Sequence, residues 1–233
     1  MTTTTPSLAA RSRTSTILLK LLMAGTGLVF IGYVLLHMYG NLKVFGGQES
    51  FDSYAEHLRE FGEPILPYSG LLWIIRVVLL GSLVVHVYSA VTLWRRAHGA
   101  RTQKYTVAKR VHSTWSSKTM RWGGLALLLF VVFHILHFTT RTITPGGDSD
   151  SPYQRLVNSF SPDQWWVPVV YLLAMGALAM HLRHGTWSAA QTLGLTGSPA
   201  ARQRANVAGY TLAVVIAGGF AIVPLSVLVG IVE

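Results

Sequence analysis

Long apolar segments alternate with shorter polar connections along the chain. The hydrocarbon core of a bilayer is about 30 Å thick and needs roughly 20 apolar residues in helical conformation. Five segments are long enough, at residues 17–39, 67–94, 122–140, 165–187 and 207–232. Tryptophan and tyrosine residues lie near the ends of these segments, as they do at membrane–water interfaces. The pattern predicts an all-α membrane protein with five transmembrane helices, forming a single domain over residues 1–233.

The connection at residues 41–66 has a helical period of its own. One face of a helix over this stretch would carry Phe51, Tyr54, His57 and Leu58. We therefore expect an outer amphipathic segment that lies on the membrane surface and covers one end of the bundle.

The composition supports insertion into a membrane. Only 12% of the residues are charged, about half the share of roughly 25% that soluble domains carry. The chain has no cysteine. This excludes disulfides, thiolate zinc sites and cysteine-ligated iron–sulfur clusters within it.

The distribution of basic residues predicts the orientation. Lysine and arginine gather before the first span, between spans two and three, and around the connection of spans four and five: Arg11, Arg13, Lys20, Arg95, Arg96, Arg101, Lys104, Lys109, Arg110, Lys118, Arg121, Arg183, Arg202 and Arg204. Because such residues mark the cytoplasmic side, we expect a cytoplasmic tail at residues 1–16 and a C-terminus outside the cell inner (cytoplasmic) membrane. We read the first apolar segment as a retained span, since it is longer than that of a signal peptide. The net charge of +10 follows from this topology, and we expect no nucleic-acid partner.

Six of the nine histidines lie within the predicted spans: His37, His86, His134, His137, His181 and His184. Ionisable residues inside a membrane are costly and usually functional. At a rise of about 1.5 Å per residue, His37 and the histidines of the third span fall in the outer half of the membrane. His86 and His181 fall in the inner half.

Two histidines at one depth on two helices are suited to bind one haem iron from opposite sides. The spans provide this arrangement twice, so the sequence predicts two b haems in an up-down bundle of four helices. The fifth span has no histidine and is expected to be peripheral. In the third span His134 and His137 remain alternatives, because they lie on one helix face, and depth alone slightly favours His137.

Four stretches carry a resemblance to a known family: Leu35-Leu-His-Met-Tyr-Gly-Asn-Leu42, Val84-Val-His-Val-Tyr-Ser-Ala-Val91, the segment from Gly124 to His134, and His181-Leu-Arg-His-Gly-Thr-Trp-Ser188 followed by Gln191-Thr-Leu-Gly194. In these stretches the chain resembles the dihaem cytochrome b558-type membrane anchor of succinate dehydrogenase and fumarate reductase, the succinate:quinone oxidoreductases. The last stretch is the most specific of the four. The resemblance covers nearly the whole chain.

The resemblance implies roles for individual residues. In the family the third-span ligand follows a glycine by ten residues, which corresponds to His134 after Gly124 and favours it over His137. The other three ligand positions match His37, His86 and His181. The outer haem iron would then be bound by His37 and His134, and the inner haem iron by His86 and His181.

The resemblance also implies a complex. A flavoprotein subunit would oxidise succinate at the cytoplasmic face, and an iron–sulfur subunit would pass the electrons to this chain. The chain would carry them through its haems to a quinone, with menaquinone expected. It would be a subunit of an enzyme that does not itself oxidise succinate, since it has no flavin or dinucleotide signature and no catalytic residues of that kind.

Candidate groups for proton exchange with a quinone lie on the outer connection: Glu56, His57 and Glu63. The commoner reason for such residues is a solvated face of an amphipathic helix. Arg76 lies inside the second span and needs a carboxylate, a carbonyl or a cofactor carboxyl as its partner.

Three other readings of the same residues stay open. One is a haem-less structural anchor that keeps the fold but has lost a cofactor, against which the four matched histidines argue. A dihaem cytochrome b that anchors another quinone-linked dehydrogenase, such as hydrogenase or formate dehydrogenase, would keep the haems and change the partner. A proton-coupled transporter with a histidine relay would show an internal repeat or broken helices, and the sequence shows neither.

Overall fold

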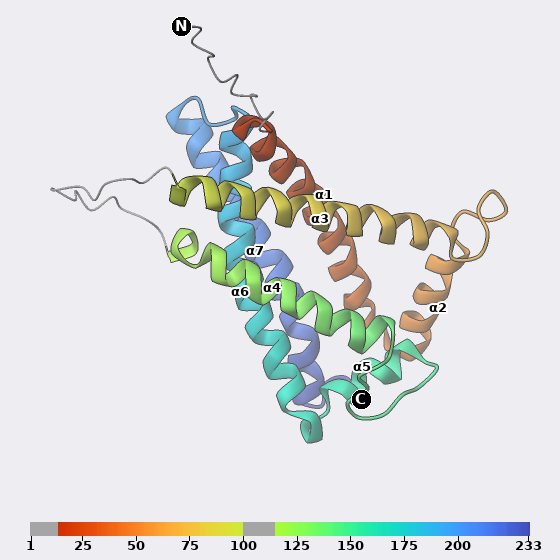
Figure 1. Ribbon diagram of the computed structural model, residues 1–233. Coiled ribbons are helices and arrows are strands. Elements are labelled where there is room, and N and C mark those ends of the chain that lie inside the picture. Colours follow the sequence, from red (N-terminus) through yellow and green to blue (C-terminus); the bar gives the residue numbers. More distant parts are fainter. Residues whose placement is uncertain (1–13, 100–114) are drawn as a thin grey trace, which may run out of the picture.

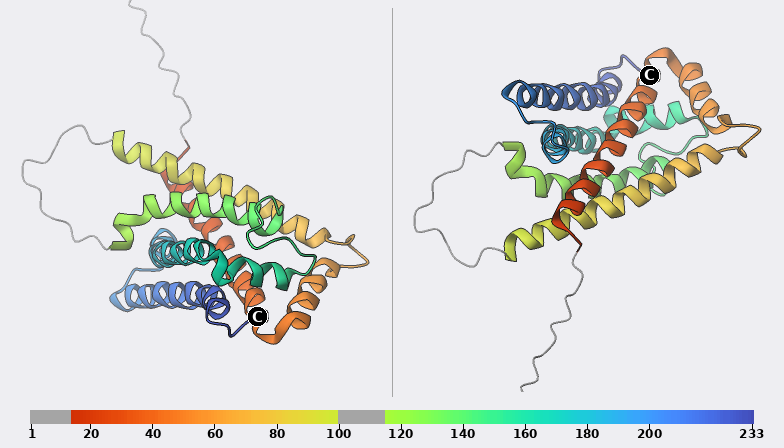
Figure 2. Two further views of the ribbon diagram at one scale, coloured as in Figure 1. Left: turned by 90° about the horizontal axis from the view of Figure 1, so that it is seen from below. Right: turned by 90° about the horizontal axis from the view of Figure 1, so that it is seen from above.

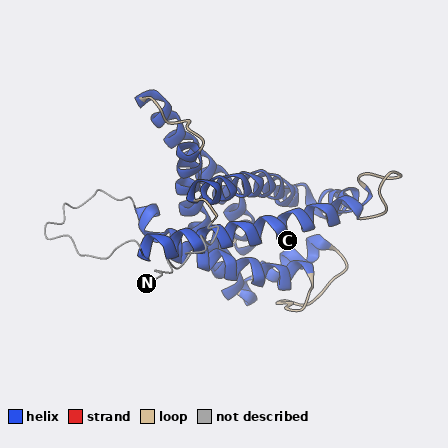
Figure 3. Cartoon of the chain, turned by 45° about the horizontal axis from the view of Figure 1, so that its top comes forward, coloured by secondary structure: helices blue, strands red, loops and turns tan. Residues whose placement is uncertain are grey.

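The computed structural model describes residues 14–99 and 115–233, and within these ranges it contains helices and loops but no strand (Figures 1 and 3). The five long helices are α1 (Thr16–Leu42), α3 (Gly70–Gly99), α4 (Trp115–His134), α6 (Trp166–Thr192) and α7 (Pro199–Leu228). All five are long and apolar enough to cross a membrane. The predicted fold class is therefore confirmed. Outside the described residues lie most of the predicted cytoplasmic tail and, in the basic connection, Arg101, Lys104, Lys109 and Arg110.

The long helices run alternately in opposite directions (Figure 1). Helices α1, α4 and α7 begin at the end of the bundle where α3 and α6 finish. The opposite end carries the short helices α2 (Gly47–Glu60) and α5 (Pro152–Phe160) and the C-terminus. Following the predicted orientation, we call these the inner end and the outer end. The remaining helical elements are short: the 3₁₀ helices η1 (Lys43–Gly46) and η3 (Pro162–Gln164), and the π-helical turn η2 (Ile135–Thr139).

Helix α2 occupies the connection predicted to be amphipathic. Its Tyr54 packs on α1, where a Cβ atom added to Gly40 would come within 2.8 Å of the Tyr54 ring. Phe51 packs on the hydrophobic cluster of the outer end, and Leu58 is half-buried. His57 is exposed, because the face that packs is centred on the other three residues and His57 lies at its edge.

Two helix starts differ from the sequence-based expectation. Helix α5 was not predicted; Ser151 caps its first turn and Pro152 follows at the first helical position. Helix α7 begins at Pro199, well before the predicted residue 207, and Ser198 caps it in the same way. In both cases a serine–proline pair marks a helix start inside a segment that reads as a polar loop.

The long helices pack unevenly. The closest packing joins α6 with α7, α4 with α6, and α1 with α3, and α1 also contacts α6 and α7 (Figure 2). Neither α1 with α4 nor α3 with α6 packs along its length within the described residues. These two diagonal pairs meet through side chains, and histidines from all four helices lie where they meet.

The best-packed part of the protein is the outer end. A hydrophobic cluster there joins η1, α5, α6, α7 and the C-terminus: Val44, Tyr153, Leu156, Phe160, Val167, Tyr171, Val223, Val227 and Val232. Asp52 of α2 fixes α5 on this cluster, since it accepts hydrogen bonds from the Ser151 hydroxyl (2.6 Å) and the Tyr153 amide (2.9 Å). The outer end of the bundle is thereby covered by two short helices that are bonded to each other.

Candidate functional site

One pair of histidine rings lies toward the outer end, between α1 and α4. His37 and His134 have ring centroids 5.7 Å apart and ring planes at 80° to each other. A bond from a metal to an imidazole nitrogen is about 2 Å long, so two imidazoles on opposite sides of one iron have centroids roughly 6 Å apart. The structure thus brings the two predicted outer ligands to a spacing that suits one metal ion. We call them the outer pair.

Aromatic rings enclose the outer pair. Tyr33 stacks on His37 with centroids 5.4 Å apart, and Phe220 of α7 lies 5.7 Å from the same ring. Phe130 and Phe138 both contact the ring of the partner histidine. These rings give the outer pair apolar walls contributed by three of the long helices and η2.

His134 and His137 share one hydrogen-bond partner. The hydroxyl of Tyr171 in α6 lies 3.1 Å from Nδ1 of His134 and 3.0 Å from Nδ1 of His137. Nε2 of His137 lies 2.8 Å from the hydroxyl of Ser159 in α5. Both ring nitrogens of His137 therefore contact protein groups, whereas Nε2 of His134 has no hydrogen bond within the described residues. This geometry favours His134 as the ligand candidate, against the slight preference for His137 from depth alone.

A second pair of rings lies closer to the inner end, between α3 and α6. His86 and His181 have ring centroids 6.3 Å apart and ring planes at 49°. The hydroxyl of Thr26 in α1 lies 3.0 Å from Nδ1 of His86. Nδ1 of His181 is buried and has no hydrogen-bond partner within the described residues. We call His86 and His181 the inner pair.

Two glycines face the inner pair. A Cβ atom added to Gly27 of α1 would lie 3.7 Å from Cε1 of His86, and one added to Gly124 of α4 would lie 3.7 Å from Cε1 of His181. A side chain longer than a methyl group would press on either ring. The glycines leave room beside the histidines, as a bulky planar ligand requires.

The two pairs lie at different depths. Thr26, which contacts the inner pair, and His37 of the outer pair both belong to α1. At about 1.5 Å per residue their Cα atoms are roughly 16 Å apart along the helix axis. The structure therefore contains two separate histidine sites stacked along the bundle, with the pairing that the sequence predicted.

A family model described as the succinate dehydrogenase/fumarate reductase transmembrane subunit matches residues 95–225, more than half of the chain. The chain belongs to this family. His134 and His181 lie inside the matched region, and His37 and His86 precede it. No curated protein and no solved structure matches the chain.

Family membership assigns the broad role. The chain is a multi-pass membrane anchor subunit of a succinate dehydrogenase or fumarate reductase, and so part of an oxidoreductase complex of several subunits. The resemblance inferred from the four sequence stretches is confirmed at the level of the family.

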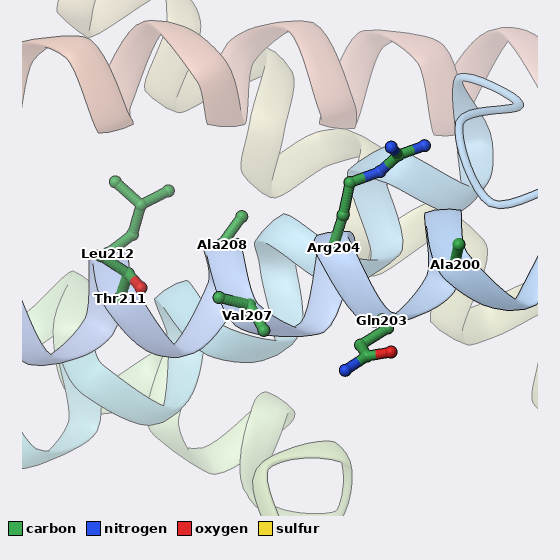
Figure 4. Close-up of a pocket in the computed structure, with 7 residues that line it drawn as sticks. All are labelled: Ala200, Gln203, Arg204, Val207, Ala208, Thr211 and Leu212. Atoms are coloured by element: carbon green, nitrogen blue, oxygen red, sulfur yellow. The ribbon is translucent and has the colours of Figure 1, made fainter.

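Two hollows of the anchor subunit lie away from the outer pair. One, of about 680 Å³, is lined by seven residues of α7 alone, from Ala200 to Leu212, and none of them is a histidine (Figure 4). The other, of about 700 Å³, lies at the inner end between α1, α3 and α6. Its lining includes Lys20, Arg96 and Met23, and Met23 is within one helical turn of Thr26. The second hollow therefore adjoins the inner pair and is cationic.

The three candidates for proton exchange lie at the outer end. Glu56 pairs with Arg59 (3.1 Å) and accepts a hydrogen bond from the Tyr68 hydroxyl (2.7 Å). This bond raises the pKa of Tyr68, because the phenolate would lose the bond and be repelled by the carboxylate. His57 and Glu63 are exposed. Of the three, Glu56 is already engaged by two neighbours.

The sequence analysis missed three polar residues that contact the site histidines: Thr26, Ser159 and Tyr171. Thr26 and Tyr171 are polar residues inside apolar spans, which is a usable signal. Ser159 lies in a connection, and no sequence pattern links it to His137. Arg76 has a partner of a kind that was not expected, since it lies over the Trp73 ring at 4.8 Å in a cation–π contact.

Proposed function

We propose that the anchor subunit transfers electrons from a partner iron–sulfur subunit through two b haems to a quinone. The observation that carries this proposal is the pairing of four histidines from four helices, with ring centroids 5.7 Å and 6.3 Å apart at two depths. A single buried histidine is readily explained by packing. Packing alone does not explain why two pairs of histidine rings are in contact when the backbones of their helices, α1 with α4 and α3 with α6, do not pack against each other.

The residues present fit haem at both sites. His37 and His134 would hold the outer haem, and His86 and His181 the inner haem. When bound, each haem supplies a one-electron carrier whose potential depends on its axial ligands and their surroundings. No group of three or more His, Asp and Glu side chains within the described residues is arranged to hold a metal ion by itself. None is needed for haem iron, because the porphyrin supplies the remaining ligands.

The cationic hollow at the inner end suits the carboxylates of the inner haem. Lys20 and Arg96 line it from α1 and α3. Charge-assisted hydrogen bonds from such groups to carboxylates are among the strongest in proteins. The two side chains would orient the inner haem with its anionic edge toward the inner surface.

The proposed route runs from the inner end to the outer end. The basic connection would face the iron–sulfur subunit, which receives electrons from the flavoprotein subunit at the cytoplasmic surface. The quinone, with menaquinone expected, would be reduced near the outer pair, and Glu56, His57 or Glu63 would exchange protons with it. The N-terminus would be cytoplasmic and the C-terminus outside the inner (cytoplasmic) membrane.

The test is a dithionite-reduced minus oxidised visible spectrum of the purified membrane complex, with pyridine haemochrome quantitation. We expect two haem b per chain. Replacing His37 or His134 with Ala should remove one haem, and replacing His86 or His181 should remove the other. The matched control is His137→Ala, which removes a buried histidine of the same helical region and should leave both haems bound.

One haem per chain would restrict the proposal to the pair whose variants lose it. A complex that reduces quinone with no haem in this subunit would overturn the proposal, and electrons would then pass directly from the partner's cluster to the quinone. Loss of a haem in His137→Ala with retention in His134→Ala would exchange these two residues in the assignment.

A further inference from the structure

We infer that Tyr171, His137 and Ser159 form a hydrogen-bond network that fixes the tautomer and orientation of His134, so that its Nε2 lone pair is free to bind the outer haem iron. We call these three residues the outer network. They are positioning residues, because they act on the outer haem through His134. The inference rests on the proposed function and deepens it, since it names the groups that tune one of the two haems.

The direction of the hydrogen bonds follows from the far end of the outer network. Ser159 Oγ lies 2.6 Å from the carbonyl oxygen of Arg155 and 3.5 Å from that of Pro145. A carbonyl oxygen can only accept, and the contact with the Arg155 carbonyl is the shortest that Ser159 Oγ makes, so we assign the hydroxyl hydrogen to it. Ser159 Oγ must then accept from His137 Nε2, 2.8 Å away. A neutral His137 with its hydrogen on Nε2 has an unprotonated Nδ1.

The hydrogen bonds of Tyr171 follow the same donor-to-acceptor direction and link His137 to the outer pair. Its hydroxyl donates its one hydrogen to the unprotonated Nδ1 of His137, 3.0 Å away. The Tyr171 oxygen therefore accepts from Nδ1 of His134, 3.1 Å away, and that nitrogen carries the hydrogen. Nε2 of a neutral His134 is left with a free lone pair. This is the form of imidazole that binds iron, and here protein groups alone select it.

Burial keeps water from replacing these bonds. His137 and Ser159 are each 3% exposed and Tyr171 is 8% exposed. Phe138 stacks on the His137 ring with centroids 4.0 Å apart. Buried polar groups are almost always paired, and in the outer network each donor finds its acceptor in one consistent direction. Packing alone would not require this unbroken order from the Arg155 carbonyl to His134.

The network has an electronic consequence. A ligating imidazole that donates its second N–H becomes more basic, and its ring is held in one orientation. A more basic axial ligand stabilises ferric iron and lowers the reduction potential of the haem. Removing the acceptor should raise the outer-haem potential and release the His134 ring from its 80° angle to His37.

Tyr171→Phe in the complete purified complex is the primary test, because it removes only the hydroxyl. The outer haem is first identified as the one lost in His134→Ala. We expect Tyr171→Phe to keep two haems, to shift the midpoint potential of the outer haem to more positive values, and to change the g-values of its ferric EPR signal. The inner haem should keep its potential and its signal.

Tyr33→Phe is the matched control. It also removes one phenolic hydroxyl beside the outer pair, but Tyr33 contacts His37 with its ring face, at 5.4 Å between centroids. We expect no shift of the outer-haem potential in this variant. Ser159→Ala tests the far end of the outer network, which does not touch the outer pair. It should shift the outer-haem potential in the same direction as Tyr171→Phe, but less.

The outcomes separate the inference from the proposed function. If two haems are bound and neither Tyr171→Phe nor Ser159→Ala changes the outer-haem potential or EPR signal, the inference is overturned and the proposed function stands. An equal shift in Tyr33→Phe would overturn it as well, since any nearby hydroxyl would then suffice. If Tyr171→Phe loses the outer haem, Ser159→Ala becomes the deciding variant. A positive shift of its outer-haem potential supports the inference, and an unchanged potential overturns it. A wild-type complex without an outer haem would overturn both proposals.

Discussion

The outer and inner pairs have similar ring spacings and very different surroundings. The outer pair lies among aromatic rings beside the hydrophobic cluster that α5, α6 and α7 form. The inner pair adjoins a hollow of about 700 Å³ with cationic side chains in its lining. One site is closed by the protein itself. The other is open at the end where the soluble subunits are expected to bind.

In each pair, Nδ1 of one histidine lies within hydrogen-bond distance of a hydroxyl group. Thr26 Oγ1 lies 2.7 Å from the Leu22 carbonyl oxygen and 3.0 Å from Nδ1 of His86. We assign the hydroxyl hydrogen to the shorter contact, so that the oxygen accepts from His86. This assignment gives His86 the same tautomer as the one inferred for His134, through one threonine instead of three side chains. Within the described residues Nδ1 of His181 is buried and has no hydrogen-bond partner. The inner pair thus combines one histidine with a hydrogen-bonded Nδ1, His86, and one whose Nδ1 has no partner, His181.

The largest effect should come from filling the space beside the inner pair. Gly124→Leu would place a branched side chain where a Cβ atom alone is already 3.7 Å from the His181 ring. Such overpacking costs about 1–3 kcal/mol, and here it would also occupy the place of the cofactor. We expect loss of one haem per chain by pyridine haemochrome analysis, with the outer haem kept.

Ala126→Leu is the control for this substitution. Ala126 belongs to the same helix but is exposed on another face, so both haems should remain. Retention of both haems in Gly124→Leu would show that the inner haem does not need the space beside Gly124. The proposed contrast between an open inner site and a closed outer site would then be wrong.

The next effect should come from opening the outer end. Asp52→Ala removes the carboxylate that accepts from the Ser151 hydroxyl at 2.6 Å and the Tyr153 amide at 2.9 Å. Hydrogen bonds to charged groups contribute about 1.5–3 kcal/mol each, so we expect a loss of roughly 2 kcal/mol once exposure is considered. Differential scanning calorimetry of the complex should show a lower Tm. Loosening of the outer end should let His37 or His134 dissociate from the iron in part of the population, so that the outer haem binds carbon monoxide, while the inner haem is unchanged.

Gln154→Ala serves as the comparison, because its side chain joins α5 to α2 through Gln48 at 3.0 Å with no charged partner. It should lower Tm less than Asp52→Ala. If both haems became equally reactive in Asp52→Ala, the covering of the outer pair by α2 and α5 would not be what separates the two sites.

A smaller effect is expected at the inner pair from Thr26→Val, which keeps the shape of the side chain and removes the acceptor for His86 Nδ1. A neutral hydrogen bond contributes about 1 kcal/mol. The inner-haem potential should rise in a redox titration, and the outer-haem potential should stay constant. Thr26→Ser keeps the hydroxyl and should restore the wild-type value. A shift of the outer haem instead would reverse the assignment of the two pairs to the two haems.

The positions of the histidines were predictable because depth in a membrane is a local property. A rise of about 1.5 Å per residue places each ring along its own helix without any knowledge of the neighbours. Five apolar segments, with histidines in four of them, were therefore enough for the pairing of His37 with the third span and of His86 with His181. The serine–proline starts of α5 and α7 also have a local signal, although it competes with the general polarity of loops.

The choice between His134 and His137 could not be made from such local properties. Both lie on one face of one helix, and what separates them is contributed by Tyr171 from α6 and Ser159 from α5. Those contacts depend on how three helices are rotated against one another. No spacing within a single segment contains that information. The resemblance to the family favoured His134 by analogy, and the hydrogen bonds add a physical reason for proposing it as the ligand.

The smallest effect is expected at the exposed outer surface, where Glu56 pairs with Arg59 at 3.1 Å and Tyr68 at 2.7 Å. Exposed ion pairs contribute at most about 1 kcal/mol. Glu56→Gln should therefore change the unfolding free energy by less than about 1 kcal/mol and leave both haem potentials unaltered. Because its carboxylate is already engaged, we expect quinone reduction to slow less in Glu56→Gln than in Glu63→Gln, in steady-state assays with a menaquinone analogue. Glu60→Gln, a neighbouring acid in α2, is the control. A larger loss in Glu56→Gln than in Glu63→Gln would mean that the bonds to Arg59 and Tyr68 hold a proton-exchanging group in place, and the outer surface would then belong to the site.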